Sequence, residues 1–417
     1  MKFGQKIKRI MCVALSAGML MNVCACGSGM SKNTVNLMSG IRASSKNESV
    51  EPSDDFVGSY ADFAINLFRQ SAVDEKNAAI SPLSVMLALA MTANGAEGET
   101  LVQMQNALGG MDIEDLNKYL SSYVKNLPSS DKSKITLANS IWLRDDKNRL
   151  NVNDDFLKAN ANYYSADAYS APFDSDTLND INNWVSENTD GRIKEMLNEI
   201  SVDAVMYLIN ALTFDAEWLE PYIENNVVEE KFNGTNGKQT VDMMYSGESK
   251  YIDDGKATGF VKPYADGYSF VALLPNEGVS IGEYIASMSG EKFVESVKKA
   301  KSCTVSTSMP KFTTEYSVEL SDALKAMGMT SAFDDKADFS GIDSQHELLF
   351  ISQVIHKTYI SVNERGTKAG AATAVEMRDG AALKEIKYVM LNRPFVYAII
   401  DNETSLPIFI GAVMNVE

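Results

Sequence analysis

The sequence predicts an α+β fold with more than one β-sheet, on the basis of three observations. Helical patterns concentrate in the first half of the chain and strand patterns in the second half, which is typical of an α+β domain. From Tyr60 to Val416 we find no linker, low-complexity run or internal repeat. A single domain over residues 58–417, of about 360 residues, exceeds the usual domain size, so we expect its core to contain several sheets.

The N-terminus is typical of an export signal. Residues 1–10 carry four basic side chains and no acidic one, and a short apolar run follows that is too short to span a membrane comfortably. The run ends in "VCACGS", which resembles the lipobox of bacterial lipoproteins. This resemblance implies a signal peptide over residues 1–25, lipidation of Cys26 and anchoring at the outer face of a membrane. The alternative is an ordinary signal peptide with an incidental cysteine.

The segment after the signal is rich in Ser, Asn, Gly and Asp, and we expect residues 26–57 to form a lipidated cysteine followed by a flexible spacer. A helical stripe that includes Phe63 and Leu67 then opens the folded domain. Two helices follow, separated at Asn94-Gly95. Ser81 suits the cap of the first of these helices, because its side chain can accept a hydrogen bond from a free N–H of the first turn.

The strand signals lie mostly in the later part of the chain. One segment alternates with period two around Pro310 and then passes into a helix over residues 320–329. Two closing strands end the chain. The predicted strands cover residues 135–143, 204–218, 268–275, 303–320 in two parts, the second half of 346–364, 387–401 and 407–416.

Composition argues against a nucleic-acid binder and gives no sign of an enzyme. The formal net charge is −18, whereas a nucleic-acid-binding protein needs a basic face. The chain has two histidines, His346 and His356, and no Gly-x-Ser-x-Gly elbow. No Cys/His cluster suits zinc, so we expect neither a metal nor a cofactor. His356 lies in an apolar, strand-like context and is expected to be a buried structural residue; a pair of acids for glycoside hydrolysis is the remaining enzymatic alternative.

Residues 363–385, "NERGTKAGAATAVEMRDGAALKE", form an unusually bland segment. Every second side chain from Thr367 to Met377 is small, β-branched or apolar, and the intervening set holds Lys368, Glu376 and Arg378. This alternation indicates a strand with one buried face, whose small side chains would let it enter a sheet without being blocked by bulk. Gly366 would serve as a hinge, because glycine tolerates unusual backbone angles. The alternative is an edge strand followed by a loop.

This segment resembles the proximal hinge of inhibitory serpins, in which Glu-x-Gly-Thr precedes a run of small residues. Five further blocks resemble the family in the family's order, so the resemblance covers about residues 58–416. The hinge residues are Glu364, Gly366, Thr367, Ala369, Gly370, Ala371, Ala372 and Thr373, and the further blocks begin at Asn77, Asn139, Ile181, Leu208 and Val389.

The resemblance implies a serpin fold, with three mostly antiparallel sheets, about nine helices and an exposed reactive-centre loop. It also implies a suicide inhibitor rather than an enzyme: a target serine protease attacks the loop, and the cleaved loop enters the large sheet as a new strand before the acyl-enzyme is hydrolysed. We expect an extracellular monomer with no nucleic-acid partner and no membrane contact except its lipid. The implied shutter residues are Ser81, Ser84, Asn210 and His356.

The scissile bond stays open between two positions. Counting from the hinge places it at Gly380-Ala381, and counting back from "LNRPF" places it near Leu383-Lys384, because the loop is longer than the common form. Small residues suit an elastase-like protease and Leu383 a chymotrypsin-like or subtilisin-like one, whereas Arg378 or Lys384 suits a trypsin-like one. We favour elastase-like or subtilisin-like targets. A non-inhibitory serpin and a solute-binding surface lipoprotein are the alternative functions.

Overall fold

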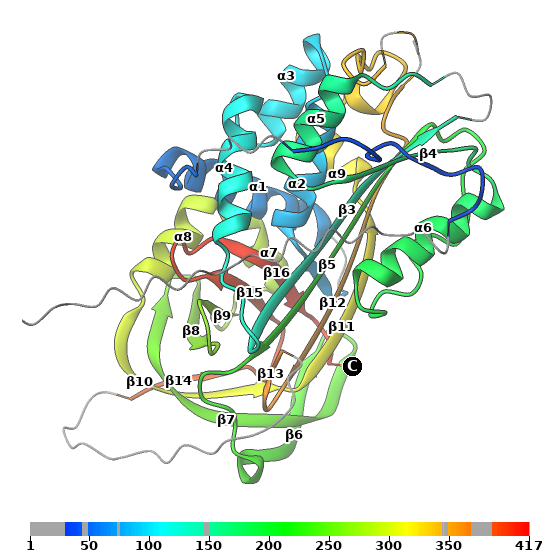
Figure 1. The fold of residues 1–417 in the computed structure, drawn as a ribbon. Helices are drawn as coiled ribbons and strands as arrows, with labels where there is room; N and C mark the ends of the chain where they lie inside the picture. Colours follow the sequence, from blue (N-terminus) through cyan, green and yellow to red (C-terminus); the bar gives the residue numbers. More distant parts are fainter. Residues whose placement is uncertain are drawn as a thin grey trace, which may run out of the picture. The chain divides into compact units, whose positions relative to one another are not determined.

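The computed structural model describes residues 30–43, 49–72, 76–145, 150–343, 345, 349–367 and 386–416. From Ser31 onward the described residues form one compact unit. They contain nine α-helices and two hydrogen-bonded sheets, one of seven strands and one of nine (Figure 1). The α+β prediction is therefore confirmed.

Six of the nine described α-helices begin at a residue whose side chain caps the first turn. The hydroxyl of Ser53 accepts the N–H of Phe56 at 3.1 Å at the start of α1, and Ser81 caps α2 with Pro82 in its first turn. Every residue of α2 is buried, so this helix lies inside the domain rather than on its surface. The helices are α1 (Asp54–Ser71), α2 (Pro82–Ala93), α3 (Gly98–Ala107), α4 (Ile113–Asn126), α5 (Asp154–Tyr163), α6 (Ser175–Asn188), α7 (Ile281–Ser287), α8 (Gly290–Lys298) and α9 (Ser321–Ala326).

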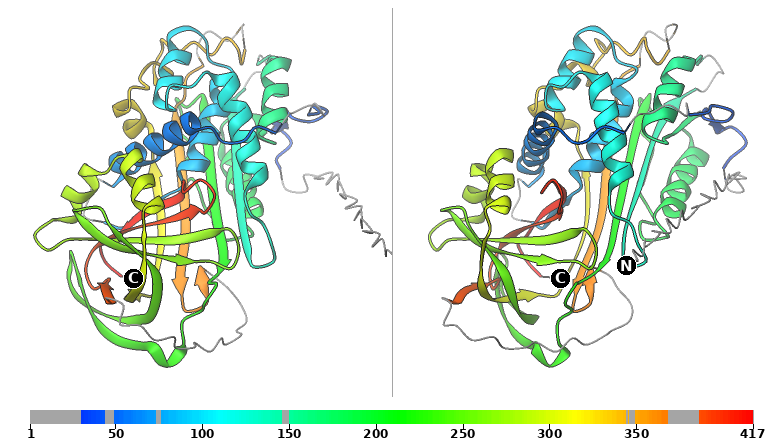
Figure 2. Two further views of the ribbon diagram at one scale, coloured as in Figure 1. Left: turned by 90° about the vertical axis from the view of Figure 1, so that its left-hand side faces the viewer. Right: turned by 60° about the vertical axis from the view of Figure 1, so that its left-hand side comes forward.

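The seven-stranded sheet has the order β1-β4-β3-β5-β13-β12-β11. Its long strands β3 and β5 are antiparallel, whereas β5 and β12 are parallel. Figure 1 and both views of Figure 2 place the short β13 at one end of β5 and β12. The strands are β1 (Val35–Asn36), β3 (Ser133–Arg144), β4 (Asp167–Ala171), β5 (Met206–Glu217), β11 (Phe312–Glu319), β12 (Gln353–Asn363) and β13 (Gly366–Thr367).

The nine-stranded sheet joins two regions through its longest strand, β7. One end of β7 pairs with β6, its other end pairs with β8, and β10 pairs with its middle part, from Met243 to Tyr251. Two of the three expected sheets are therefore joined through β7 into one continuous hydrogen-bonded sheet. The strands are β2 (Ala78–Ile80), β6 (Val227–Gly234), β7 (Gly237–Asp253), β8 (Ala257–Pro263), β9 (Tyr268–Pro275), β10 (Lys301–Pro310), β14 (Ile386–Met390), β15 (Phe395–Asp401) and β16 (Pro407–Val413).

The segment predicted as one closing strand, 387–401, is two strands that pair with different neighbours. β14 pairs in parallel with β10, and β15 lies between β9 and β16. The break falls before Phe395, at Pro394, which has no N–H for a ladder hydrogen bond.

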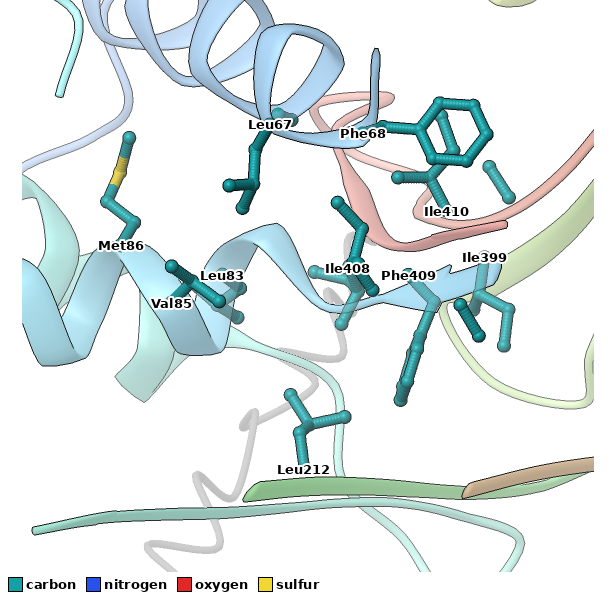
Figure 3. Packing of buried hydrophobic residues seen from close by; sticks show 14 of the residues in the cluster. Leu67, Phe68, Leu83, Val85, Met86, Leu212, Ile399, Ile408, Phe409 and Ile410 are labelled. Atoms are coloured by element: carbon teal, nitrogen blue, oxygen red, sulfur yellow. The ribbon is translucent and has the colours of Figure 1, made fainter. Parts of the chain in front are cut away.

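The core lies between α1, α2 and the two sheets. Figure 3 shows Leu67 of α1, Val85 of α2, Leu212 of β5 and Phe409 of β16 in one buried cluster, and each exposes at most 2% of its surface. Because α2 packs between β16 and the seven-stranded sheet, its cap Ser81 and its first-turn residue Ser84 hydrogen-bond with β12 and β5.

The N-terminal segment departs from the prediction of a flexible spacer over 26–57. β1 pairs antiparallel with β4, which makes it an edge strand of the seven-stranded sheet. The buried carboxylate of Asp180 in α6 accepts the N–H of Ser31 at 2.9 Å and the hydroxyl of Thr34 at 2.5 Å. The spacer prediction is therefore wrong for residues 31–43, which dock through these polar contacts and through Leu37, Met38 and Ile41, which pack against the core.

The start of the domain is also earlier than residue 58, because α1 begins at Asp54. Val50 already contacts the domain, since its N–H donates to the hydroxyl of Ser122 at 2.9 Å. Cys26 lies outside the described residues. None of the helices in the described ranges is both long enough and apolar enough to cross a membrane.

Candidate functional site

The candidate site is the point where β13 begins a strand between β5 and β12. Gly366 and Thr367 pair antiparallel with both neighbours, with Asn363 and Val362 of β12 on one side and Glu217 and Ala216 of β5 on the other. Beyond this pair, β5 and β12 bond directly to each other. Their parallel register runs from Gln353–Tyr207 to Tyr359–Thr213. The first two residues of a middle strand are thus in place, and the rest of the position is closed.

The backbone at Gly366 accepts only glycine. Its φ is +153°, and a Cβ atom there would lie 2.0 Å from the carbonyl oxygen of Ala216. Thr367 follows with 1% of its surface exposed, and its hydroxyl lies 2.6 Å from that of Tyr264. Tyr264 in turn stacks on Trp218, with ring centroids 4.3 Å apart. The predicted hinge residue Thr367 is therefore anchored by an aromatic pair from outside the loop.

Glu364 is held by an ion pair at the entry to β13. Its carboxylate lies 2.5 Å from the ammonium of Lys311, which also contacts Asp242 at 3.3 Å. Partial burial on its own would raise the pKa of Glu364, but the hydrogen bond and charge of Lys311 outweigh it and lower that pKa. The carboxylate is therefore ionised at neutral pH.

Three successive carbonyls of the turn before β13 are bound by the segment Trp218–Tyr222. The backbone N–H groups of Trp218 and Tyr222 donate to the carbonyls of Arg365 (2.9 Å) and Glu364 (2.8 Å). The indole N–H of Trp218 donates to the carbonyl of Asn363 at 2.9 Å. The turn that leads into β13 is thus fixed by hydrogen bonds just before Gly366.

The four residues predicted as a shutter do lie together, halfway along the β5–β12 ladder. His356 and Asn210 are register partners, and Nδ1 of the ring is 2.5 Å from the side-chain oxygen of Asn210. Nε2 accepts the N–H of Ser81 at 3.0 Å, so the ring proton is on Nδ1. The Asn210 amide donates to the hydroxyl of Ser84 and to Asn139 of β3, both at 2.5 Å. This network ties α2 to three strands.

The imidazole of His356 has no exposed surface, and this burial lowers its pKa to about 3. It is therefore neutral at physiological pH, in agreement with the predicted buried and hydrogen-bonded structural histidine.

Sequence reasoning missed several partners of the hinge and shutter. Lys311, Tyr264 and Tyr222 come from other strands or loops, and Asn139 lies in β3. Their own neighbourhoods carry no signal, because their partners are distant in the chain. Only the tertiary fold brings them to the hinge and the shutter.

Many of the predicted site residues lie outside the described part of the chain. These are the hinge residues Ala369, Gly370, Ala371, Ala372 and Thr373, the scissile candidates Arg378, Gly380, Ala381, Leu383 and Lys384, and also Cys26 and His346. Within the described ranges no group of three or more His, Cys, Asp or Glu side chains could hold a metal ion.

The comparisons with known proteins all indicate the same family. Residues 58–416 match the family described as Serpin (serine protease inhibitor). An uncharacterised serpin-like protein of Thermococcus kodakarensis is 31% identical over 366 residues, which cover 85% of this chain and 84% of that protein. A serine protease inhibitor of Cyanea capillata is 32% identical over 370 residues, which cover 84% of this chain and 96% of the other.

Solved structures agree in fold. The native state of a thermophilic serpin, tengpin, superposes with a TM-score of 0.87 at 50% identity and covers 92% of this chain and 100% of its own. The latent state of the same protein gives a TM-score of 0.78 at 48% identity, covering 89% of this chain and 100% of its own. The arrangement described here is therefore more similar to the native state.

Proposed function

Because this chain belongs to the serpin family, whose family description is serine protease inhibitor, we propose that it is a suicide inhibitor of serine proteases. The part of its cleaved loop between Thr367 and the scissile bond would enter the seven-stranded sheet between β5 and β12 and trap the protease as an acyl-enzyme. The chain itself supplies no catalytic group in this proposal, because the attacking serine belongs to the target.

The position of β13 is the observation that carries the proposal. β13 is antiparallel to both β5 and β12, which are themselves parallel to each other below it. A strand that continued β13 would replace one parallel ladder with two antiparallel ladders, and antiparallel pairing is slightly more stable per residue. The described residues thus contain both the start of the new strand and a less stable ladder for it to displace.

The sequence after Thr367 fits such an insertion. Thr367 is buried and bonded to Tyr264, so its face of the sheet is the inner one. In a continuous strand, Ala369, Ala371 and Thr373 would share that face, and small side chains can enter it without displacing the core. Lys368 would take the opposite face.

The shutter network marks where the sheet must part. Because His356 and Asn210 are direct partners in the β5–β12 ladder, a strand passing between them has to break their hydrogen bond. The network would therefore resist insertion until the loop is cut.

The chemistry follows from the acyl-enzyme. The protease serine adds to the loop carbonyl at the scissile bond, the peptide C–N bond breaks, and the new amino terminus leaves with the C-terminal fragment. The N-terminal part of the loop stays esterified to the serine. If insertion is faster than hydrolysis of this ester, the distorted protease cannot complete its cycle.

The target class and location are part of the same proposal. Gly380-Ala381 as the scissile bond favours an elastase-like protease, Leu383 a subtilisin-like one, and Arg378 or Lys384 a trypsin-like one. Lipidation of Cys26 would hold the inhibitor as a monomer on the outer surface of the cell, where secreted proteases are encountered.

The test mixes the protein lacking residues 1–25 with elastase-type, subtilisin-type and trypsin-type proteases. We expect a complex that survives denaturing electrophoresis with at least one of them, and the released C-terminal peptide identifies the scissile bond. Cleavage in the loop without a stable complex for every protease would instead support a non-inhibitory serpin. No cleavage in the loop at all would contradict the proposal. Mass spectrometry of the exported protein tests lipidation at Cys26.

A further inference from the structure

A buried lysine lies beside the segment that holds the hinge turn. Lys262, in β8, exposes 3% of its side chain, and its ammonium nitrogen is 2.9 Å from the carboxylate of Glu248, which is 7% exposed. The same nitrogen donates to the backbone carbonyl of Glu220 at 3.1 Å. It also lies 4.3 Å from the ring centre of Tyr222 and 5.5 Å from that of Trp218.

Stability alone is a poor explanation for this pair. Removing two charges from water is costly, and a buried ion pair often contributes no more than a well-packed apolar pair of the same volume. The pair does orient the groups around it, because an ammonium group directs its hydrogens towards specific oxygens and aromatic rings. The contacts made by Lys262 therefore define a position for the segment Trp218–Tyr222.

That segment has no regular secondary structure of its own along most of its length. The segment also bonds to β8 through its backbone. The N–H of Leu219 donates to the carbonyl of Pro263, the residue after Lys262, at 3.0 Å. As described above, the segment donates to the carbonyls of Asn363, Glu364 and Arg365. The position of Lys262 is thus transmitted through one short segment to the turn from which the loop departs.

The register set at this turn decides which side chains enter the core. With Thr367 opposite Ala216 and Val362, the small residues of the loop fall on the inner face. A slip of one residue would exchange the two faces, because the side-chain period of a strand is two. Lys368, Glu376 and Arg378 would then be directed into an apolar core without partners, which would stall insertion.

We propose that Lys262 is a positioning residue for loop insertion. Through its buried pair with Glu248 it fixes the segment Trp218–Tyr222, and through that segment it fixes the register in which the cleaved loop enters the sheet. The inference rests on the proposed inhibitory function. Because insertion competes with hydrolysis of the acyl-enzyme, a loss of register would raise the stoichiometry of inhibition, the number of inhibitor molecules consumed for each protease molecule trapped.

The experiment compares the parent with Lys262→Met, Lys262→Arg and the double variant Lys262→Met/Glu248→Leu. The double variant leaves no unpaired buried charge, so it keeps the test open if Lys262→Met fails to fold. We expect both Met variants to raise the stoichiometry about fivefold, the factor that corresponds to roughly 1 kcal/mol, while Lys262→Arg stays near the parent. Melting temperatures are measured in parallel.

A control breaks an ion pair of β5, in the seven-stranded sheet, outside the segment Trp218–Tyr222. Arg192 pairs with Asp215 of β5, and neither residue belongs to the segment Trp218–Tyr222. Arg192→Met should therefore leave the stoichiometry unchanged even if it lowers the melting temperature.

The outcomes are distinguishable. A double variant that melts lower than the parent but keeps the parent's stoichiometry makes the pair purely structural and overturns the inference. A double variant with parental values of both quantities overturns it as well. A parent protein that traps none of the proteases contradicts the proposed function first, and the register role falls with it.

Discussion

His356 shows at the residue scale how burial couples a single side chain to pH. Its pKa of about 3 in the folded protein lies below the value of about 6.5 expected for the unfolded chain. The stability that neutral His356 contributes is therefore fully present above pH 6.5 and is lost as pH falls towards 3, because the unfolded state binds the proton more readily.

We expect the free energy of unfolding to fall by about 2 kcal/mol between pH 7 and pH 5 through this histidine alone. Denaturant unfolding at several pH values measures the loss, in a range where most carboxylates stay ionised. The variant His356→Asn should be less stable at pH 7 and should lack this part of the pH dependence. An equal slope in the two proteins would contradict the assignment.

A substitution at Thr367 is also expected to have a large effect, in this case on inhibition. It is buried, with 1% exposed, against the hydroxyl of Tyr264. We expect Thr367→Arg to convert the protein from an inhibitor into a substrate, because a guanidinium group would have to enter the inner face of the sheet without a partner. Denaturing electrophoresis should show cleaved protein and no complex. Thr367→Ser serves as the control and should still form complex; full inhibition by the Arg variant would contradict insertion.

The residues of the site differ in whether their local sequence is enough to predict their role. Ser81 could be identified as a helix cap from its neighbours, and the alternation after Thr367 is also local. Asn210 and His356 could be paired only through resemblance to a family, because 146 residues separate them. Lys311 and Tyr264 could not be found, since each is an ordinary strand or turn residue until the fold places it at the hinge.

At the scale of elements, β1 is a strand that the composition of its segment does not predict. Most of residues 31–43 are polar or small, and such segments are usually disordered, because they have little apolar surface to bury. Here backbone pairing with β4, the carboxylate of Asp180 and the packing of Leu37, Met38 and Ile41 against the core provide the attachment. The helices α1, α2, α3 and α9 were predicted, because apolar periodicity is a local feature of the sequence, whereas α4 to α8 were missed.

Replacing Asp180 should release this N-terminal segment. Asp180 is buried and accepts hydrogen bonds from Ser31 and Thr34, so in Asp180→Ala we expect amide hydrogen exchange at Ser31 to rise about tenfold, as for the loss of a charged hydrogen bond. Asp176→Ala, at an exposed position of the same helix, is the control and should leave this exchange unchanged. Unchanged protection in Asp180→Ala would show that β1 docks without the carboxylate.

At the scale of the whole molecule, the proposed mechanism requires that the uncut protein is not the most stable arrangement of its own chain. Cutting the loop should therefore raise the melting temperature sharply. About ten new ladder hydrogen bonds at roughly 1 kcal/mol each give a sufficient driving force. Calorimetry before and after limited cleavage measures the change, with protein exposed to inactivated protease as the control. An unchanged melting temperature would argue against stored energy.

The general architecture was predictable, and its finer connections were not. Helix-rich and strand-rich halves indicated α+β, and the length indicated several sheets. No strand was predicted between residues 218 and 268, so β7, its 17 residues and its two sets of partners were missed.

The pairing of β2 with β16 has a consequence for how the protein is made. The strand Ala78–Ile80 pairs with residues 410–412, which are among the last to be synthesised. The hydroxyl of Tyr60 likewise donates to the carbonyl of Pro407. A ribosome therefore finishes almost the whole chain before the core can close, and such distant contacts make folding slow. A polypeptide that stays unfolded during synthesis can still pass through a narrow translocation pore, as the proposed signal peptide would require, and can fold on the far side.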